Sequence, residues 1–136
     1  MALRKKGEHY YGDSQHDLTL EIKRFAECNN YPADEISEVK CANCKQQLFM
    51  LFSDTDESGA LCKCKNCSEK IFIRDSQDFI NLEELDNHEC VCGNTDFTVN
   101  VGLSFYQGVK DVRWVYTGGY CAKCGMVGIY IDWNER

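Results

Sequence analysis

Eight of the ten cysteines in this 136-residue chain fall into four close pairs, a spacing typical of metal binding. A two-residue spacer lets both sulfurs of a pair face one ion from a single tight turn, and a second such turn completes a tetrahedral site. Nineteen residues separate the first two pairs, and 28 separate the last two. The sequence therefore predicts two Cys₄ sites, formed by Cys41, Cys44, Cys64 and Cys67 and by Cys90, Cys92, Cys121 and Cys124.

The remaining cysteines leave one alternative at the first site. Cys62 lies two residues before Cys64, so it competes with Cys64 as a ligand. We assign the Cys64/Cys67 pair because its spacing is the regular one. Cys62 and Cys28 are then interpreted as small buried apolar residues.

The third pair is tighter than usual, because only Val91 separates its two cysteines. Gly93 follows it and suits a turn that needs a positive φ. His88 lies two residues before Cys90 and is a competing ligand, but four cysteines already complete that site.

Zinc is the metal that four thiolates of this spacing indicate, and we expect two ions per chain. Structural zinc sites contribute about 10–16 kcal/mol of apparent binding energy in small peptides, which is comparable with the whole stability of a domain. Iron in such a site is the alternative, and would give a rubredoxin-like electron carrier. Disulfides are a further alternative.

The Cys-x-x-Cys pairs and the lack of an apolar signal segment after residues 4–6 favour a soluble cytoplasmic protein without a membrane span.

The pattern of apolar residues predicts a small, metal-stabilised, β-rich (α+β) protein in which two tandem zinc ribbons follow an N-terminal helix. Residues 1–38 form the lead-in and helix, 39–75 the first ribbon and 76–136 the second. Residues 1–12 are expected to be loose. Ser14 and Asp17 predict a capping box, and an apolar stripe at helical spacing follows, formed by Leu18, Ile22, Phe25 and Ala26. Residues 33–40 are expected to add a helical turn.

Strands are predicted on both ribbons. The apolar run 48–52 reads as a buried strand, with a return strand before Cys64 and a third at 70–74. An acidic connector, 75–89, includes a short helix near residues 82–85. Residues 97–105 alternate with a period of two, which indicates a strand with one buried face, and two further strands follow at 112–116 and 127–133.

Charge favours a basic partner over a nucleic acid. The formal net charge is -7, and two Zn(Cys)₄ centres would lower it to about -11. Such a surface repels phosphate backbones. We expect the contact surface to include acidic side chains of the first ribbon's turn and of the connector: Asp54, Asp56, Glu57, Glu83, Glu84 and Asp86. One hairpin supports the nucleic-acid alternative, because it groups Tyr106, Lys110, Arg113, Trp114 and Tyr116.

Other chemistry is not indicated, and we expect no enzymatic activity. Catalytic zinc usually has three protein ligands and an open position, whereas both sites here count four thiolates. The deaminase signature needs a proline before its cysteine pair, and the only proline is Pro32. The turn at 54–59 imitates the start of a calcium loop, but Lys65 stands where the bidentate glutamate belongs.

The cysteine plan resembles the knuckles of zinc-ribbon and rubredoxin-like proteins. The stretch from 113–116 through Cys121–Gly125 to 130–133 is similar to small bacterial double-ribbon proteins that are mostly uncharacterised. Some acidic proteins of this kind are immunity partners of secreted toxins. The resemblance implies a zinc-binding interaction module with a basic partner such as a nuclease toxin. A transcription-associated adaptor is the alternative.

Overall fold

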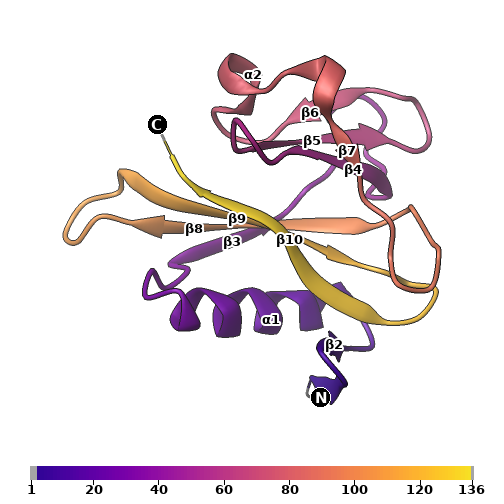
Figure 1. Ribbon diagram of the computed structural model, residues 1–136, viewed down its shortest axis with the longest axis horizontal. Helices are drawn as coiled ribbons and strands as arrows, with labels where there is room; N and C mark the ends of the chain where they lie inside the picture. Colours follow the sequence, from indigo (N-terminus) through magenta and orange to yellow (C-terminus); the bar gives the residue numbers. More distant parts are fainter. Residues whose placement is uncertain (1–2, 136) are drawn as a thin grey trace.

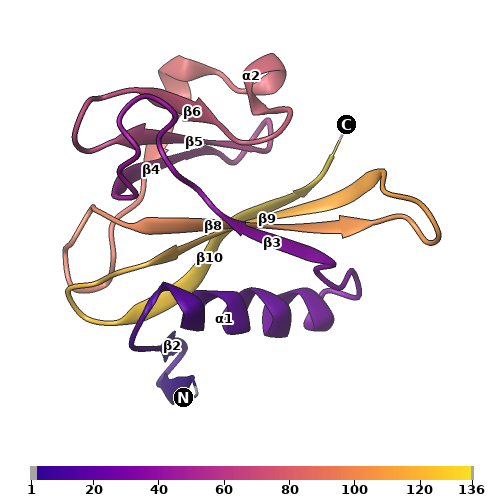
Figure 2. The same cartoon turned by 180° about the vertical axis from the view of Figure 1, so that it is seen from behind.

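The computed structural model describes residues 3–135 and has three layers. One long helix covers one face of a six-stranded antiparallel sheet, and a four-stranded antiparallel sheet covers the other face (Figure 1). Figure 2 shows the same order from behind. The chain is therefore β-rich, with one long helix.

The six-stranded sheet is built around the three strands that the alternating pattern predicted. In spatial order its strands are β1 (Arg4–Lys6), β2 (His9–Tyr11), β10 (Met126–Asn134), β9 (Val112–Tyr120), β8 (Thr98–Phe105) and β3 (Glu35–Glu38). A turn at residues 106–111 joins β8 to β9, and the Tyr106 N–H donates to the Asp111 carbonyl at 3.0 Å. Strands β8, β9 and β10 are the three predicted strands, and they form the middle of the sheet.

N-terminal segments complete both edges of this sheet, which corrects two expectations. Residues 1–12 are not a loose lead-in where the structure describes them, because β2 pairs with β10 and β1 pairs with β2. Residues 33–40 form no helical turn; β3 pairs with β8 instead. The physical reason is that the outer edges of β8 and β10 carry backbone donors and acceptors that need partners.

Helix α1 (Gln15–Cys28) packs on the six-stranded sheet through its apolar stripe. Leu18, Ile22 and Ala26 are fully buried against Tyr116 and Val127. None of the described helices combines the length and the apolarity that a membrane span requires.

The predicted capping box at the start of α1 is wrong. Ser14 is the N-cap residue, but its side chain makes no capping hydrogen bond. The Asp17 carboxylate accepts from the Asp13 N–H at 2.7 Å instead. The acidic group still lies in the first turn, where it meets the positive end of the helix dipole.

The four-stranded sheet consists of β6 (Lys70–Phe72), β5 (Gly59–Cys64), β4 (Phe49–Asp54) and β7 (Asp86–Asn87), in that order. Between β6 and β7 the connector forms two short elements, α2 (Ser76–Phe79) and the 3₁₀ turn η1 (Leu82–Glu84). The inner face of the sheet packs on the six-stranded sheet, and the buried residues between them include Phe49, Leu51, Cys62, Val99, Val115 and Trp133.

Specific polar contacts join the two sheets. Phe49 and Phe97 exchange two backbone hydrogen bonds of 2.8 Å, and Trp133 Nε1 donates to the Asp75 carboxylate at 3.1 Å. The predicted division at residues 38 and 75 stays a prediction. The first 38 residues supply three strands of the sheet whose centre is β8–β10.

Candidate metal centres

The eight paired cysteines form two clusters, one on each sheet. Within each cluster the four sulfurs lie within 4.8 Å of one another. The short contacts are 3.5 Å for Cys41–Cys67 and Cys44–Cys64, 3.4 Å for Cys90–Cys124 and 3.7 Å for Cys92–Cys121. A tetrahedral ion with metal–sulfur bonds of about 2.3 Å separates its ligands by about 3.8 Å. Both clusters can therefore hold a metal ion, as a double zinc-ribbon-like protein requires. The role of the eight residues as ligands stays a prediction.

Three of the four turns have the same backbone geometry. In each, the N–H of the first cysteine donates to the carbonyl five residues on, and its carbonyl accepts from the N–H four residues on, at 2.7–2.9 Å. The residue that supplies this last N–H has a positive φ; the three such residues are Lys45, Ser68 and Gly125. The repeated turn points both sulfurs of a pair to one side.

The fourth turn, at Cys90, is one residue shorter. The Cys90 N–H donates to the Asn94 carbonyl at 2.7 Å, and the Gly93 N–H donates to the Cys90 carbonyl at 2.8 Å. Gly93 has a φ of 95°, which a residue with a side chain rarely adopts. The shorter spacer is thus accommodated by glycine, as the sequence indicated.

Two asparagines stabilise the first cluster reciprocally. Each stands immediately before the second cysteine of its own pair and donates to the second cysteine of the other pair. The Asn66 amide and the Gln46 N–H lower the pKa of Cys44 to about 6. The Asn43 amide and the Glu69 N–H lower the pKa of Cys67. Both thiolates are therefore favoured, and thiolate is the form that binds metal.

The first cluster needs a cation if all four sulfurs ionise together. The Cys44 N–H donates to the Cys41 sulfur, but burial and the neighbouring thiols outweigh it and raise the pKa of Cys41 to about 11. Four thiolates at these distances repel one another. A divalent ion offsets this repulsion and keeps every sulfur deprotonated.

The second cluster has a single asparagine. Asn94 Nδ2 donates to the Cys121 sulfur at 3.2 Å. Burial raises the pKa of Cys121, but this amide and two backbone N–H groups outweigh it, and the pKa falls to about 7. Burial raises the pKa of Cys90, while Cys92 is exposed. The second cluster is therefore open to solvent at Cys92, whereas none of the four cysteines of the first cluster is exposed.

The competing ligands lie outside both clusters. Cys62 is fully buried between the sheets, and burial raises the pKa of its thiol to about 12. Nε2 of His88 and Oγ of Ser53 form a hydrogen bond of 2.6 Å, and the His88 ring packs on Tyr130. The interpretation of Cys28 as a buried residue is wrong, because its side chain is exposed.

Asp54 is a structural residue that sequence reasoning misplaced among the surface acids. It is only 2% exposed, and its carboxylate accepts from the backbone N–H groups of Asp56, Glu57 and Asn81 at 2.8–3.1 Å. The Asn81 bond is the largest cause of its lowered pKa. The calcium-like spacing thus reflects a turn in which an aspartate holds backbone donors.

Asp54 also brings the two predicted acidic segments together. Its bond to Asn81 ties the turn to the connector, and Thr55 Oγ1 donates to the Asp86 carboxylate at 3.5 Å. The other five candidate acids are exposed. They lie in the turn after β4, in η1 and in β7, and are together called the acidic surface over β4, β7 and η1: Asp56, Glu57, Glu83, Glu84 and Asp86.

The functional residues that sequence reasoning missed are the asparagines. Asn43 and Asn66 share one position, directly before the second cysteine of a Cys-x-x-Cys pair. That shared position is a usable signal, because a side-chain amide there is close to the sulfurs of the opposite turn. Asn94 has no counterpart at the same spacing.

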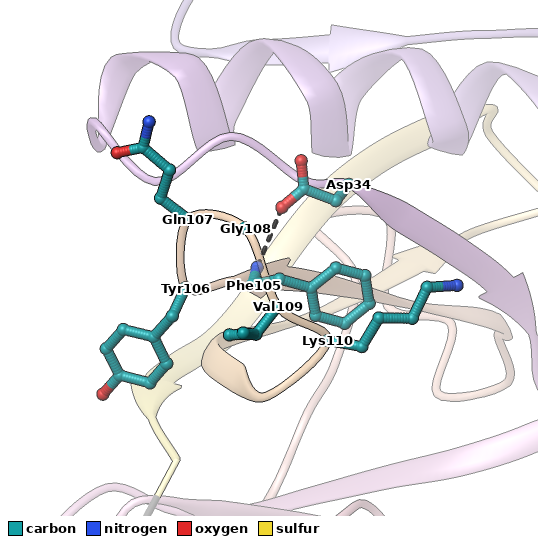
Figure 3. A pocket seen from close by; sticks show the side chains of 7 residues that line it. All are labelled: Asp34, Phe105, Tyr106, Gln107, Gly108, Val109 and Lys110. Carbon is teal, nitrogen blue, oxygen red and sulfur yellow. Dashed lines mark hydrogen bonds between the residues drawn. The ribbon is translucent and has the colours of Figure 1, made fainter.

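A hollow lies away from both clusters, at the β8–β9 turn. It has a volume of about 510 Å³ and is lined by Asp34 and residues 105–110. Figure 3 shows that Tyr106 and Lys110 point in different directions, and that the Asp34 carboxylate accepts from the Phe105 N–H, at 2.8 Å. The one acid at this site is thus engaged with the backbone.

Comparison with protein-family models, with curated proteins and with solved structures gives no match. The resemblance to double-ribbon and immunity-type proteins therefore rests on the sequence pattern alone.

Proposed function

We propose that this chain is a non-catalytic zinc protein of the double zinc-ribbon type that binds a basic protein partner. The observation that carries the metal assignment is the pair of clusters, each with four sulfurs within 4.8 Å. Zinc accepts four thiolates in a tetrahedron and is the usual occupant of structural Cys₄ sites. Four sulfurs leave no open position for substrate or water, so the centres serve the fold.

Elemental analysis and the visible spectrum test the metal assignment together. Reduced, freshly purified protein should contain zinc and lack visible absorption. Iron in a Cys₄ site would colour the protein, and would favour the rubredoxin-like electron carrier instead. A colourless protein that contains no zinc would contradict both proposals.

The partner proposal is supported by the acidic surface over β4, β7 and η1. Its five carboxylates come from two segments that Asp54 holds together, and the chain has a formal net charge of -7. Acidic surfaces accelerate encounter with basic proteins, and the effect weakens as salt rises. A cytoplasmic inhibitor of a basic toxin, as the resemblance implies, would use such a surface.

Charge reversal tests this surface against a matched control. Glu83→Lys with Glu84→Lys should leave zinc content unchanged and reduce the capture of basic proteins from native lysate. Glu8→Lys with Glu27→Lys makes the same charge change at exposed positions outside this surface. If both variants lose the same amount of captured protein, net charge alone explains the binding, and the proposal of a specific surface is contradicted.

One observation favours a nucleic-acid adaptor as the second candidate. The Arg113 guanidinium lies 4.1 Å from the Tyr31 ring centroid and 5.6 Å from that of Tyr106, and Tyr31 stacks on Trp114. Tyr106 is 45% exposed, so a base can stack there. Tyr116 does not belong to this group, because it is buried and its hydroxyl donates to the Tyr31 carbonyl.

Fluorescence anisotropy with single-stranded oligonucleotides discriminates the candidates. Tight, salt-sensitive binding at about 0.15 M salt that Tyr106→Ala weakens would favour the adaptor. We expect no such binding.

A further inference from the structure

The outer face of the four-stranded sheet carries an apolar row beside a basic row. Register places Phe52 opposite Leu61 and Leu61 opposite Phe72. The neighbouring row pairs Met50 with Lys63 and Lys63 with Lys70. Both rows point away from the six-stranded sheet, since the alternate residues of β4 and β5 are buried between the sheets.

The connector turns these rows into a pocket. Its volume is about 190 Å³, and its lining consists of Phe52, Leu61, Lys63, Lys70, Leu82 and Leu85. Leu82 remains 53% exposed although it forms part of the wall. An apolar cavity of about 150 Å³ accepts a benzene ring, so this space suits one ring or a short branched chain.

The two lysines of the lining lack an anionic partner in the described part of the chain. Lys63 and Lys70 are directly opposite on neighbouring strands, where like charges destabilise a sheet. Among residues 3–135, no carboxylate forms an ion pair with either ammonium group. The carboxylate of Glu84, in the connector that forms part of the lining, accepts from Asn81 Nδ2 at 3.1 Å. An anion between the two ammonium groups would relieve their repulsion.

We propose that this pocket binds a small carboxylate with a compact apolar group. The apolar group packs between Leu61 and Leu82, and the carboxylate lies between Lys63 and Lys70. The lysine stems extend the apolar wall and keep their charges at its rim. The lining contains none of the eight clustered cysteines, although Lys63 directly precedes Cys64 in the sequence. The proposal does not depend on the proposed function.

The test compares an acid with its neutral isostere on the zinc-loaded protein. Phenylacetate and phenylacetamide are titrated into ¹⁵N-labelled protein, and the amide shifts of Leu61, Lys63, Lys70 and Leu82 are followed. We expect the acid to bind at least roughly fivefold more tightly, because a charge-assisted contact is stronger than a neutral one. Acetyl-Gly-Phe and its C-terminal amide form a second arm, which distinguishes a free acid from a peptide C-terminus.

Lysine substitutions complete the test. Lys63→Gln with Lys70→Gln should abolish the preference for the acid while the amide still binds. Lys23→Gln with Lys40→Gln, which removes the same charge elsewhere, should keep the preference. Three results would each overturn the proposal. The first is equal binding of acid and amide, and the second is a set of shifts that the Lys63/Lys70 variant does not alter. The third is the absence of any shift in either arm at concentrations on the order of 10 mM.

Discussion

The two cysteine clusters have similar geometry, but the sheets that carry them differ greatly in size and in buried core. The first closes a four-stranded sheet whose edge strands, β6 and β7, have three and two residues. The second lies at one end of a six-stranded sheet that has a second core under α1, with Leu18, Ile22 and Tyr116 fully buried. The same ligand set should thus contribute unequally to folding. We expect the small sheet to depend on a bound metal ion for its stability, because edge strands this short bury little apolar surface.

The largest expected effect is a difference in amide protection between variants that lose one or the other metal centre. Cys64→Ser should remove one metal ion and the amide protection of β4, β5 and β6, since the binding energy of a structural site is folding energy. Cys121→Ser should also remove one ion, but β8, β9 and α1 should remain protected by their own core. Hydrogen exchange with mass spectrometry measures both. Equal loss of protection in the two variants, or an unprotected α1 in the unmodified protein, would contradict the comparison.

A smaller effect is expected from the asparagines around the sulfurs. Asn43→Ala with Asn66→Ala removes two amide donors from the first cluster, and Asn94→Ala removes one from the second. Losing such outer contacts typically costs about 10–100-fold in metal affinity. Chelator competition should show a larger loss at the first centre than at the second. Asn87→Ala, at an exposed position of β7, is the control and should change neither affinity.

Asp54, at the end of β4 in the four-stranded sheet, should make the stability of the protein depend on pH. Its pKa is lowered in the folded protein, chiefly by the Asn81 N–H, so its contribution to stability is complete above the unfolded pKa of about 3.9. That contribution is lost as the pH falls through the pKa of Asp54 in the folded protein. Asp54→Asn should therefore cost about 1–2 kcal/mol at pH 7, and the difference from the unmodified protein should shrink below about pH 4. Urea unfolding at several pH values measures it; Asp56→Asn should cost much less.

The smallest effects belong to the two cysteines outside the clusters. Cys62→Ser should keep both ions but lose about 1–3 kcal/mol of stability, because it buries a hydroxyl between the sheets. Cys28→Ser should change neither quantity, since this side chain is exposed. If Cys62→Ser loses an ion, Cys62 rather than Cys64 is the ligand.

Local signals in the sequence predict much of this structure. The period of two in 97–105 predicts β8, the apolar stripe from Leu18 predicts α1, and the cysteine spacing predicts which sulfurs meet. Strands β1, β2 and β3 carry no comparable signal, because three- and four-residue strands exist only through pairing with β8, β10 and one another. Asp54 and the two asparagines of the first cluster were missed for a related reason. The two asparagines act on the opposite turn, and Asp54 reaches Asn81 in the connector. The position shared by Asn43 and Asn66 is a usable signal, but only the folded chain shows which groups these side chains contact.

The number of metal ions per chain tests the central claim most directly. Native mass spectrometry of the reduced protein gives this number together with the mass of each ion. Two zinc ions per chain is the predicted result, and each should be lost separately in Cys64→Ser and Cys121→Ser. One ion or none in the folded, reduced protein would contradict the account of two Cys₄ centres.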